Sequence, residues 1–263
     1  VDIPGEGGVV RIAVQVFTQD HLENPRRQQA AEHGHALERQ ARPDSPGDGL
    51  PRRLVRRRAD ELEEVLAPGR VLAGLERDIP NLWGDDLVFV EPESEHSSAT
   101  FCEGFAAAGG RVTNFTSGQG LVLMKEVLYT IAGKRLGLVF NIGARALTSH
   151  SLNVHCGHDD VMSVADCNWG ILFARNAQEA GDMCLISRRV AEASQVPFMN
   201  VQDGFLTTHT VESVLLCEPE FMKDYIGKPE DHLYNLMDPD NPIMSGVVQN
   251  QDSYMKGKIA QRW

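Results

Sequence analysis

Several features that mark common classes of protein are scarce or missing in this sequence. No apolar run approaches the roughly 18–20 residues that a membrane span needs. The first residues, Val1–Glu6, have neither the basic region nor the apolar core of a signal peptide. The five cysteines include no C-x-x-C pair, which excludes the usual iron–sulfur and zinc-finger patterns and suits reduced thiols in the cytoplasm. A net charge of −12 argues against nucleic acid as a main partner.

Residues 1–77 lack the composition of a packed domain. The first 80 residues contain one aromatic residue, Phe17, and twelve arginines without a single lysine. Only Val9–Phe17 predicts a strand, and only Ala59–Leu66 predicts a short helix. This composition favours a poorly ordered N-terminal segment. An arginine-rich arm that binds nucleic acid is the alternative, although interspersed acidic residues cancel much of its charge.

The remaining residues, 78–263, show a regular pattern in which short apolar runs alternate with helix-like segments. This order is typical of crossover units on a parallel sheet, so we predict a three-layer α/β domain with a mainly parallel sheet. The predicted strands are Leu87–Val90, Val112–Phe115, Leu138–Ile142, Gly170–Ala174 and Pro197–Val201. The predicted helices are Ser97–Ala108, Gly120–Ala132 and Ala177–Ser194, with a shorter one around Ala144–Val154.

Three carboxylates follow the first of these apolar runs. Leu87–Val90 leads directly into Glu91, Glu93 and Glu95, and a helix is predicted to begin just after them. The carboxyl ends of strands in open parallel sheets are where such proteins bind ligands. Each of the three is therefore a candidate proton donor or acceptor.

A short run of small residues lies between the second predicted strand and the following helix. In Thr116–Gly120, the backbone N–H groups around Ser117 and Gln119 could face an anion at the helix start. The run is no dinucleotide fingerprint, because Leu123 stands where the third glycine belongs, and no phosphate-binding lysine follows. A tight turn that needs small residues explains it equally well.

Arg145 stands alone among small residues at the end of the third predicted strand. Its planar guanidinium could hold a carboxylate or a phosphate through two hydrogen bonds. An ion pair with Glu91, Glu93 or Asp203 is an equally good explanation of its presence.

Three histidines lie close together in the next loop, at His150, His155 and His158. Imidazole suits zinc and iron, so a metal-dependent hydrolase is an alternative function. The spacing matches neither H-E-x-x-H nor H-x-H-x-D-H, and histidines in such loops more often bind backbone or substrate. We therefore predict no metal ligands in this chain.

Five segments, taken together and in order, resemble the first domain of the pyruvate:ferredoxin (flavodoxin) oxidoreductases, and more broadly the 2-oxoacid:acceptor oxidoreductases. They are Glu93–His96, Thr113–Leu121, Ala144–Ala146, Gly157–Asp160 and Asp203–Phe205. The resemblance implies the pyrimidine-type domain of the thiamine-diphosphate-binding fold. It also implies thiamine diphosphate as cofactor, with Mg²⁺ and iron–sulfur clusters bound by parts absent from this chain.

The resemblance assigns roles to the candidate residues. Glu95 takes the place of the glutamate that hydrogen-bonds the aminopyrimidine ring, and Ser117 and Gln119 contribute to the cofactor site. Arg145 corresponds to the arginine that holds the 2-oxoacid carboxylate, and His158 lines the substrate pocket. The implied reaction is oxidative decarboxylation of a pyruvate-like 2-oxoacid to an acyl-CoA. The implied partners are a diphosphate-binding domain or subunit, ferredoxin or flavodoxin, coenzyme A and further copies in an oligomer.

The sequence also departs from the family pattern. The family's Tyr-Pro-Ile-Thr-Pro-Ser motif is absent from residues 1–77, where arginine without lysine suggests a misread reading frame. The Gly-Asp-Gly motif with its downstream asparagine, which binds magnesium and diphosphate, is missing from residues 78–263. We therefore expect a fragment or single subunit that is inactive alone. The alternative is a catalytically inactive fragment that acts only as a subunit-pairing module.

Overall fold

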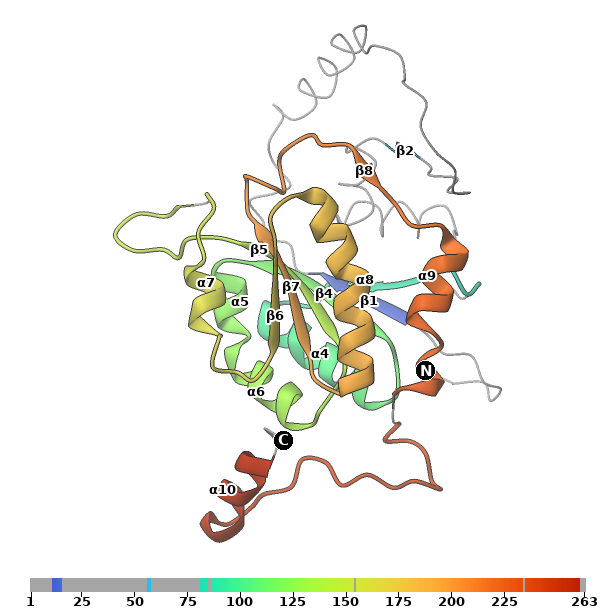
Figure 1. Ribbon diagram of the computed structural model, residues 1–263. Coiled ribbons are helices and arrows are strands. Elements are labelled where there is room, and N and C mark those ends of the chain that lie inside the picture. The colour runs from blue at the N-terminus through green and yellow to red at the C-terminus, as the bar shows by residue number, and fades with distance from the viewer. Residues whose placement is uncertain are drawn as a thin grey trace, which may run out of the picture. The chain divides into compact units, whose positions relative to one another are not determined.

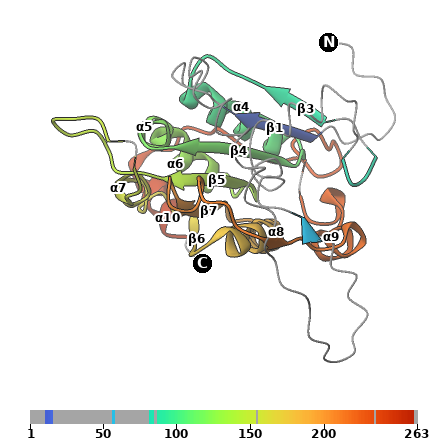
Figure 2. The ribbon, with the colours of Figure 1, turned by 90° about the horizontal axis from the view of Figure 1, so that it is seen from above.

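A six-stranded parallel sheet organises the chain (Figure 1). The computed structural model describes residues 11–15, 56–57, 81–84, 87–153, 155–233 and 235–260. All of them belong to one unit, made of residues 1–16 and 54–263, and the second unit, residues 17–53, lies outside the described residues. In sheet order the strands are β3 (Leu87–Val90), β1 (Arg11–Gln15), β4 (Val112–Ser117), β5 (Val139–Ala144), β7 (Phe198–Asp203) and β6 (Gly170–Ala174). Figure 2 shows this order from above.

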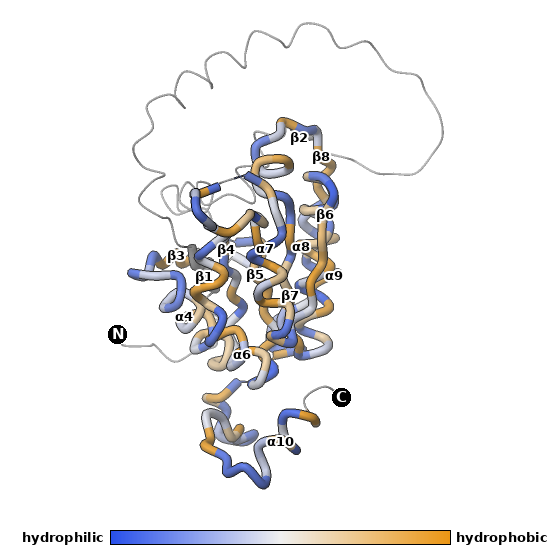
Figure 3. The backbone as a smooth tube through the Cα atoms, turned by 90° about the vertical axis from the view of Figure 1, so that its left-hand side faces the viewer, coloured by the Kyte–Doolittle hydropathy of each residue, from blue (hydrophilic) through white to orange (hydrophobic). Residues whose placement is uncertain are grey.

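The predicted parallel α/β architecture is confirmed, because every pairing in this sheet is parallel. All five strands predicted after residue 81 form, with ends that differ from the prediction by two residues at most. Strands covered on both faces read as short apolar runs, which is why the sequence reveals them. Figure 3 traces the resulting changes of hydropathy along the backbone.

The strand predicted at 9–17 is also confirmed, as β1, and it lies in the sheet between β3 and β4. Within residues 1–77 the structure also describes β2 (Arg56–Arg57), which pairs antiparallel with β8 (Val214–Leu215). The rest of that segment, including the helix predicted at 59–66, lies outside the described residues. Part of the N-terminal segment therefore contributes to the sheet itself.

Helices cover both faces of the sheet and give three layers (Figures 1 and 2). On one face lie α4 (Glu95–Ala107), α5 (Gln119–Leu123) and α6 (Lys125–Gly133). Their apolar side chains share a core with Phe140 and Ile142 of β5, which are fully buried. On the other face α8 (Ala177–Ser194) packs against β6 and β7.

The two long helices begin at side chains that satisfy their first N–H groups. Ser94 caps α4, where its hydroxyl accepts from the Ser97 N–H and the Ser97 side chain accepts from the Ser94 N–H. Asn176 caps α8 by accepting from the Glu179 N–H. Such caps stabilise a helix by about 1 kcal/mol each, so α4 and α8 start where the sequence supplies them.

The helix predicted around residues 144–154 is wrong. Ala144 ends β5, and an extended loop follows in which Arg145 forms an isolated bridge with Cys156. The N–H groups of Arg145 and Leu147 donate to aspartate side chains, and the Ala146 N–H donates to the His155 carbonyl beside the bridge. A short helix, α7 (Asp159–Ser163), forms only after this loop.

The helix predicted at 120–132 is interrupted once. The structure divides it into α5 and α6 at Met124, which is fully buried. The Met124 N–H is shared between the carbonyls of Gly120, at 3.3 Å, and Leu121, at 3.2 Å. Sharing one N–H between two carbonyls tightens the turn and ends the regular helix.

A buried ion pair ties the start of β4 to α8. The Arg111 guanidinium donates twice to Glu192, with both nitrogen–oxygen distances at 2.6 Å, and also donates to the Gly227 carbonyl. Glu192 is fully buried, and Arg188 lies beside it. Beyond this region the chain continues through α9 (Pro219–Ile226), a 3-10 turn (Pro229–Asp231) and α10 (Gln251–Ala260). Among the described residues, none of the helices is long and apolar enough to cross a membrane.

Candidate functional site

The carboxyl ends of the strands bring the predicted site segments to one edge of the sheet (Figure 1). Ser117, the last residue of β4, is paired in register with Gly143 of β5, and Ala144 is paired with Asp203 of β7. Glu95 begins α4 shortly after β3 ends at the same edge. Because all these strands are parallel, loops that are far apart in sequence start side by side.

Glu95 lies against the start of α5. A Cβ atom added at Gly120 would stand 2.8 Å from the Glu95 Cγ, 2.9 Å from its Oε1 and 2.8 Å from the Thr116 hydroxyl. No side chain fits at residue 120 unless Glu95 moves. The glycine therefore lets the half-buried carboxyl group of Glu95 reach the turn after β4.

The turn that carries Ser117 and Gln119 has a strained backbone. Gly118 has a φ of +56° and a ψ of −132°, a conformation that residues with side chains rarely adopt. Its N–H donates to the Asp160 carboxylate at 2.8 Å. The Gln119 side-chain amide donates to the Thr148 hydroxyl, so this turn is joined to the loop after β5.

Arg145 is the first residue after β5, and its side chain is partly buried. Its stem lies against Gly204, where an added Cβ would stand 2.9 Å from the Arg145 Cγ, and its guanidinium lies 5.7 Å from the ring centre of Phe205. Burial lowers the pKa of Arg145, and the nearby charge of Asp160 raises it by a smaller amount. The Nε atom is buried without a hydrogen-bond partner among the described residues.

The alternative interpretation of Arg145 finds no support. Within the described part of the chain it forms no ion pair with Glu91, Glu93 or Asp203. The Asp203 carboxylate lies instead 2.7 Å from Nε2 of His158. Asp203 is therefore already engaged, and among the described residues the Arg145 guanidinium forms no ion pair with a carboxylate.

The three histidines of the loop do not come together. His158 contacts Asp203 and the Phe173 ring, His155 packs against the Phe205 ring at 4.9 Å, and His150 faces the Ser151 hydroxyl. No group of three potential metal-binding side chains occurs among the described residues. This arrangement does not support the alternative of a metal-dependent hydrolase.

Two residues at this edge have contacts that give them a place in the site, although the sequence predicted no role for them. Asp160 is fully buried and binds the N–H groups of two neighbouring loops, although the sequence shows it only as an acidic residue beside the histidines. Phe205 has a φ of +65°, which is rare for a bulky side chain, and stacks on His209. Both residues lie within segments that carry the family resemblance, Gly157–Asp160 and Asp203–Phe205, but the sequence assigned them no role.

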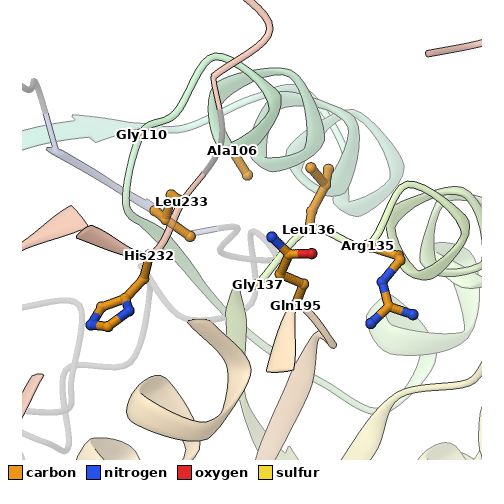
Figure 4. A pocket seen from close by; sticks show the side chains of 8 residues that line it. All are labelled: Ala106, Gly110, Arg135, Leu136, Gly137, Gln195, His232 and Leu233. Atoms are coloured by element: carbon orange, nitrogen blue, oxygen red, sulfur yellow. The ribbon is translucent and has the colours of Figure 1, made fainter. Parts of the chain in front are cut away.

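Two cavities lie at the opposite edge of the sheet, away from the candidate site. The smaller, of about 10 Å³, has room for one water molecule. Figure 4 shows it between the end of α4 and Gln195, which follows α8. The larger, of about 820 Å³, lies between α6 and residues 243–258. Neither is lined by Glu95, Arg145 or Asp160.

Comparison with known proteins identifies the family. A family model described as "Pyruvate flavodoxin/ferredoxin oxidoreductase, thiamine diP-bdg", which denotes a thiamine-diphosphate-binding domain, matches residues 59–262. This chain belongs to that family. The resemblance read from the sequence motifs is thereby confirmed.

Known relatives agree with this membership. Pyruvate synthase subunit PorA of Pyrococcus furiosus is 40% identical over 176 residues, which make up 66% of this chain and 44% of the relative. A pyruvate-flavodoxin oxidoreductase of Trichormus variabilis is 36% identical over 183 residues, which make up 68% of this chain and 15% of the relative. The chain thus spans less than half the length of each.

A solved structure shares the fold. It is the 2-oxoglutarate:ferredoxin oxidoreductase from Magnetococcus marinus, determined with 2-oxoglutarate, coenzyme A and succinyl-CoA bound. The match has a TM-score of 0.50 at 20% identity and covers 74% of this chain and 37% of the other. The two chains therefore share the three-layer α/β fold.

Proposed function

We propose that this chain is the pyrimidine-binding domain of a thiamine-diphosphate-dependent oxidoreductase that converts a pyruvate-like 2-oxoacid and coenzyme A to an acyl-CoA and carbon dioxide. Two electrons leave to ferredoxin or flavodoxin. The observation that carries the proposal is the close approach of Glu95 to Gly120 at the carboxyl edge of the sheet. Family membership supports the cofactor class.

The residues at this edge fit one end of the cofactor. Glu95 presents a half-buried carboxyl group beside a helix start from which Gly120 keeps every side chain away. A carboxyl group so placed can share a proton with a ring nitrogen of an aminopyrimidine. Gly118 and Ser117 bring backbone rather than bulky side chains to the same turn, which suits a flat ring. When bound, thiamine diphosphate supplies a carbon nucleophile and an electron sink for decarboxylation.

Arg145 fits the substrate. Its guanidinium faces no carboxylate of the described chain, and its Nε is buried and lacks a hydrogen-bond partner there. The Phe205 ring faces it, with the guanidinium carbon 5.7 Å from the ring centre. We assign Arg145 to the carboxylate of the 2-oxoacid, which it holds in one orientation for the reaction. His158, paired with Asp203, lines the same edge of the sheet, and we assign it no role in proton transfer.

The proposal requires a second component. The described residues at this edge offer no cluster of basic side chains for a diphosphate, and residues 78–263 contain no Gly-Asp-Gly motif. A diphosphate-binding domain or subunit must hold that end, so the chain alone is expected to be inactive. Isothermal titration with thiamine diphosphate and Mg²⁺ tests this point. Binding that appears only with the partner component supports the proposal, and no binding in either case favours a pairing module without catalysis.

Glu95→Gln tests the proton-holding role in the assembled enzyme. The amide keeps the size of the side chain but cannot exchange a proton at neutral pH, so kcat should fall by about 10²–10⁴-fold. Glu93→Gln is the matched control, because Glu93 is exposed at the same strand end. Normal turnover of Glu95→Gln would refute the assignment of this residue.

Arg145→Ala tests the substrate-holding role. The loss of a charge-assisted hydrogen bond costs about 1.5–3 kcal/mol, so the KM for the 2-oxoacid should rise by about 10- to 150-fold. Arg175 ends up at the same edge after β6 but is exposed and paired with Glu179, so Arg175→Ala should leave KM unchanged. Equal effects of the two substitutions would contradict the role of Arg145.

A further inference from the structure

One carboxylate joins the two loops that carry the candidate site. Asp160 is fully buried at the start of α7. Its Oδ2 atom accepts hydrogen bonds from the N–H of Gly118 at 2.8 Å and from the N–H of Arg145 at 3.0 Å. Its Oδ1 atom accepts from the N–H of Val161 at 2.7 Å. Two of its three hydrogen-bond donors therefore belong to loops outside α7.

Further hydrogen bonds join the same three segments. Asp159 accepts from the N–H of Leu147 at 3.1 Å, two residues beyond Arg145. Thr148, the next residue, receives the hydrogen bond from the Gln119 side chain. The turn after β4 and the loop after β5 are thus fastened to each other and to the start of α7. A displacement of the Asp160 carboxylate would move both loops.

Burial disfavours the charged form of the Asp160 carboxyl group. Burial raises the pKa of Asp160, and the N–H groups of Arg145, Gly118 and Val161 lower it by smaller amounts. A buried charge is tolerated in proteins where it is well hydrogen-bonded. The same charge acts on the Arg145 guanidinium, whose pKa it raises against the effect of burial. Asp160 therefore serves both the backbone position and the charge of Arg145.

We propose that Asp160 is a positioning residue: its buried carboxylate sets the direction of the Arg145 guanidinium and the place of the Gly118 turn, without touching substrate. This inference rests on the proposed function, since it acts through the substrate contact of Arg145. It predicts a specific kinetic effect. A purely structural residue, when changed, reduces the amount of folded enzyme and leaves KM unaltered, whereas a positioning residue changes KM.

Asp160→Asn is the first test, in the chain assembled with its diphosphate-binding component. Asparagine matches the size of aspartate but presents an NH₂ group to N–H donors and carries no charge. The KM for the 2-oxoacid should rise by about tenfold, a change that corresponds to about 1.4 kcal/mol. Asp182→Asn, in α8, is the matched control, because Asp182 bonds only to Gln178 of its own helix in the described structure. It should leave KM unchanged.

A double-substitution cycle separates this inference from the proposed function. If Asp160 acts through Arg145, Asp160→Asn should raise KM little further when Arg145 is already alanine. Fully additive effects, or an unchanged KM in Asp160→Asn, would overturn the role of Asp160 and leave that of Arg145 intact. An unchanged KM in Arg145→Ala would overturn both. If Asp160→Asn does not fold, Asp160→Glu enters the same cycle, and failure of both to fold would show a structural residue instead.

Discussion

The close approach of Gly120 to Glu95 offers a direct test of how the site depends on one absent side chain. In Gly120→Ala, the new Cβ would lie 2.8 Å from the Glu95 Cγ, whereas ordinary contacts are 3.4–4 Å. Glu95 must therefore retreat by at least about 0.6 Å. The atoms in the way belong to the side chains of Glu95 and Thr116 and not to the backbone, so these side chains must shift while the helices stay in place.

The effect on stability should be small because two terms oppose each other. Alanine stabilises a helix by up to about 1 kcal/mol relative to glycine, and Gly120 has an ordinary helical conformation. Forcing the Glu95 side chain away from its preferred rotamer costs about 0.5–1.5 kcal/mol. The free energy of unfolding of Gly120→Ala should therefore lie within about 1 kcal/mol of the wild-type value.

The effect on activity should be large. A misplacement on the order of 1 Å can lower a rate by about 10²-fold, and Glu95 is the group that we assign to the cofactor ring. We expect kcat of the assembled enzyme to fall by about that factor at saturating thiamine diphosphate. Urea denaturation and steady-state kinetics on the same preparation measure both quantities. Full activity in a folded Gly120→Ala enzyme would show that the place of the Glu95 carboxyl group does not matter.

Gly181→Ala is the matched control for this test. Gly181 also lies inside a helix, α8, and a Cβ added there would meet nothing within 4 Å. The substitution should increase the free energy of unfolding by up to about 1 kcal/mol and leave kcat unchanged. A loss of activity in Gly181→Ala would show that an added methyl group disturbs the enzyme even away from Glu95. The result for Gly120→Ala would then say nothing specific about the position of Glu95.

Two further predictions concern the core. Glu192→Ala should lower the free energy of unfolding by about 3–5 kcal/mol, because it leaves Arg111 and Arg188 buried without their carboxylate; a loss below about 1 kcal/mol in chemical denaturation would contradict this. Burial raises the pKa of the Cys102 thiol from 9.0 to about 12, so iodoacetamide at pH 8 should modify Cys156 and spare Cys102 until the protein unfolds. Mass spectrometry that finds Cys102 and Cys156 modified at equal rates in the folded protein would refute this protection of Cys102. The same rise in pKa means that the contribution of Cys102 to stability should persist below pH 9 and decline as the pH rises towards 12.

The sequence predicted the sheet well because burial leaves a local record. Strands enclosed by helices on both faces need apolar residues at nearly every position, so runs such as Leu138–Ile142 and Pro197–Val201, which form the central strands β5 and β7, are visible without any tertiary information. Parallel crossovers then bring all carboxyl ends to one edge. That reasoning placed the segments of Glu95, Arg145 and Asp203 together, and the strand order confirms the placement.

Contacts between distant residues left no such record. The helix predicted around residues 144–154 fails because Arg145 and Ala146 continue in an extended conformation after β5 and pair with residues 155 and 156 further along the chain. Asp160 is 42 positions from Gly118, and no local sequence pattern predicts the hydrogen bond between them. The close approach of Gly120 to Glu95 likewise depends on how α4 and α5 pack. The roles of the individual site residues stay predictions until the substitutions are made.

Arg145 is the point at which stability and function diverge at this edge. Its buried Nε lacks a hydrogen-bond partner among the described residues, and such a donor costs about 1–3 kcal/mol. The neighbouring carboxylates are engaged elsewhere, since Asp203 pairs with His158 and Asp160 binds backbone N–H groups. Because a ligand that binds only the folded state stabilises that state, we expect a carboxylate bound at Arg145 to offset this cost.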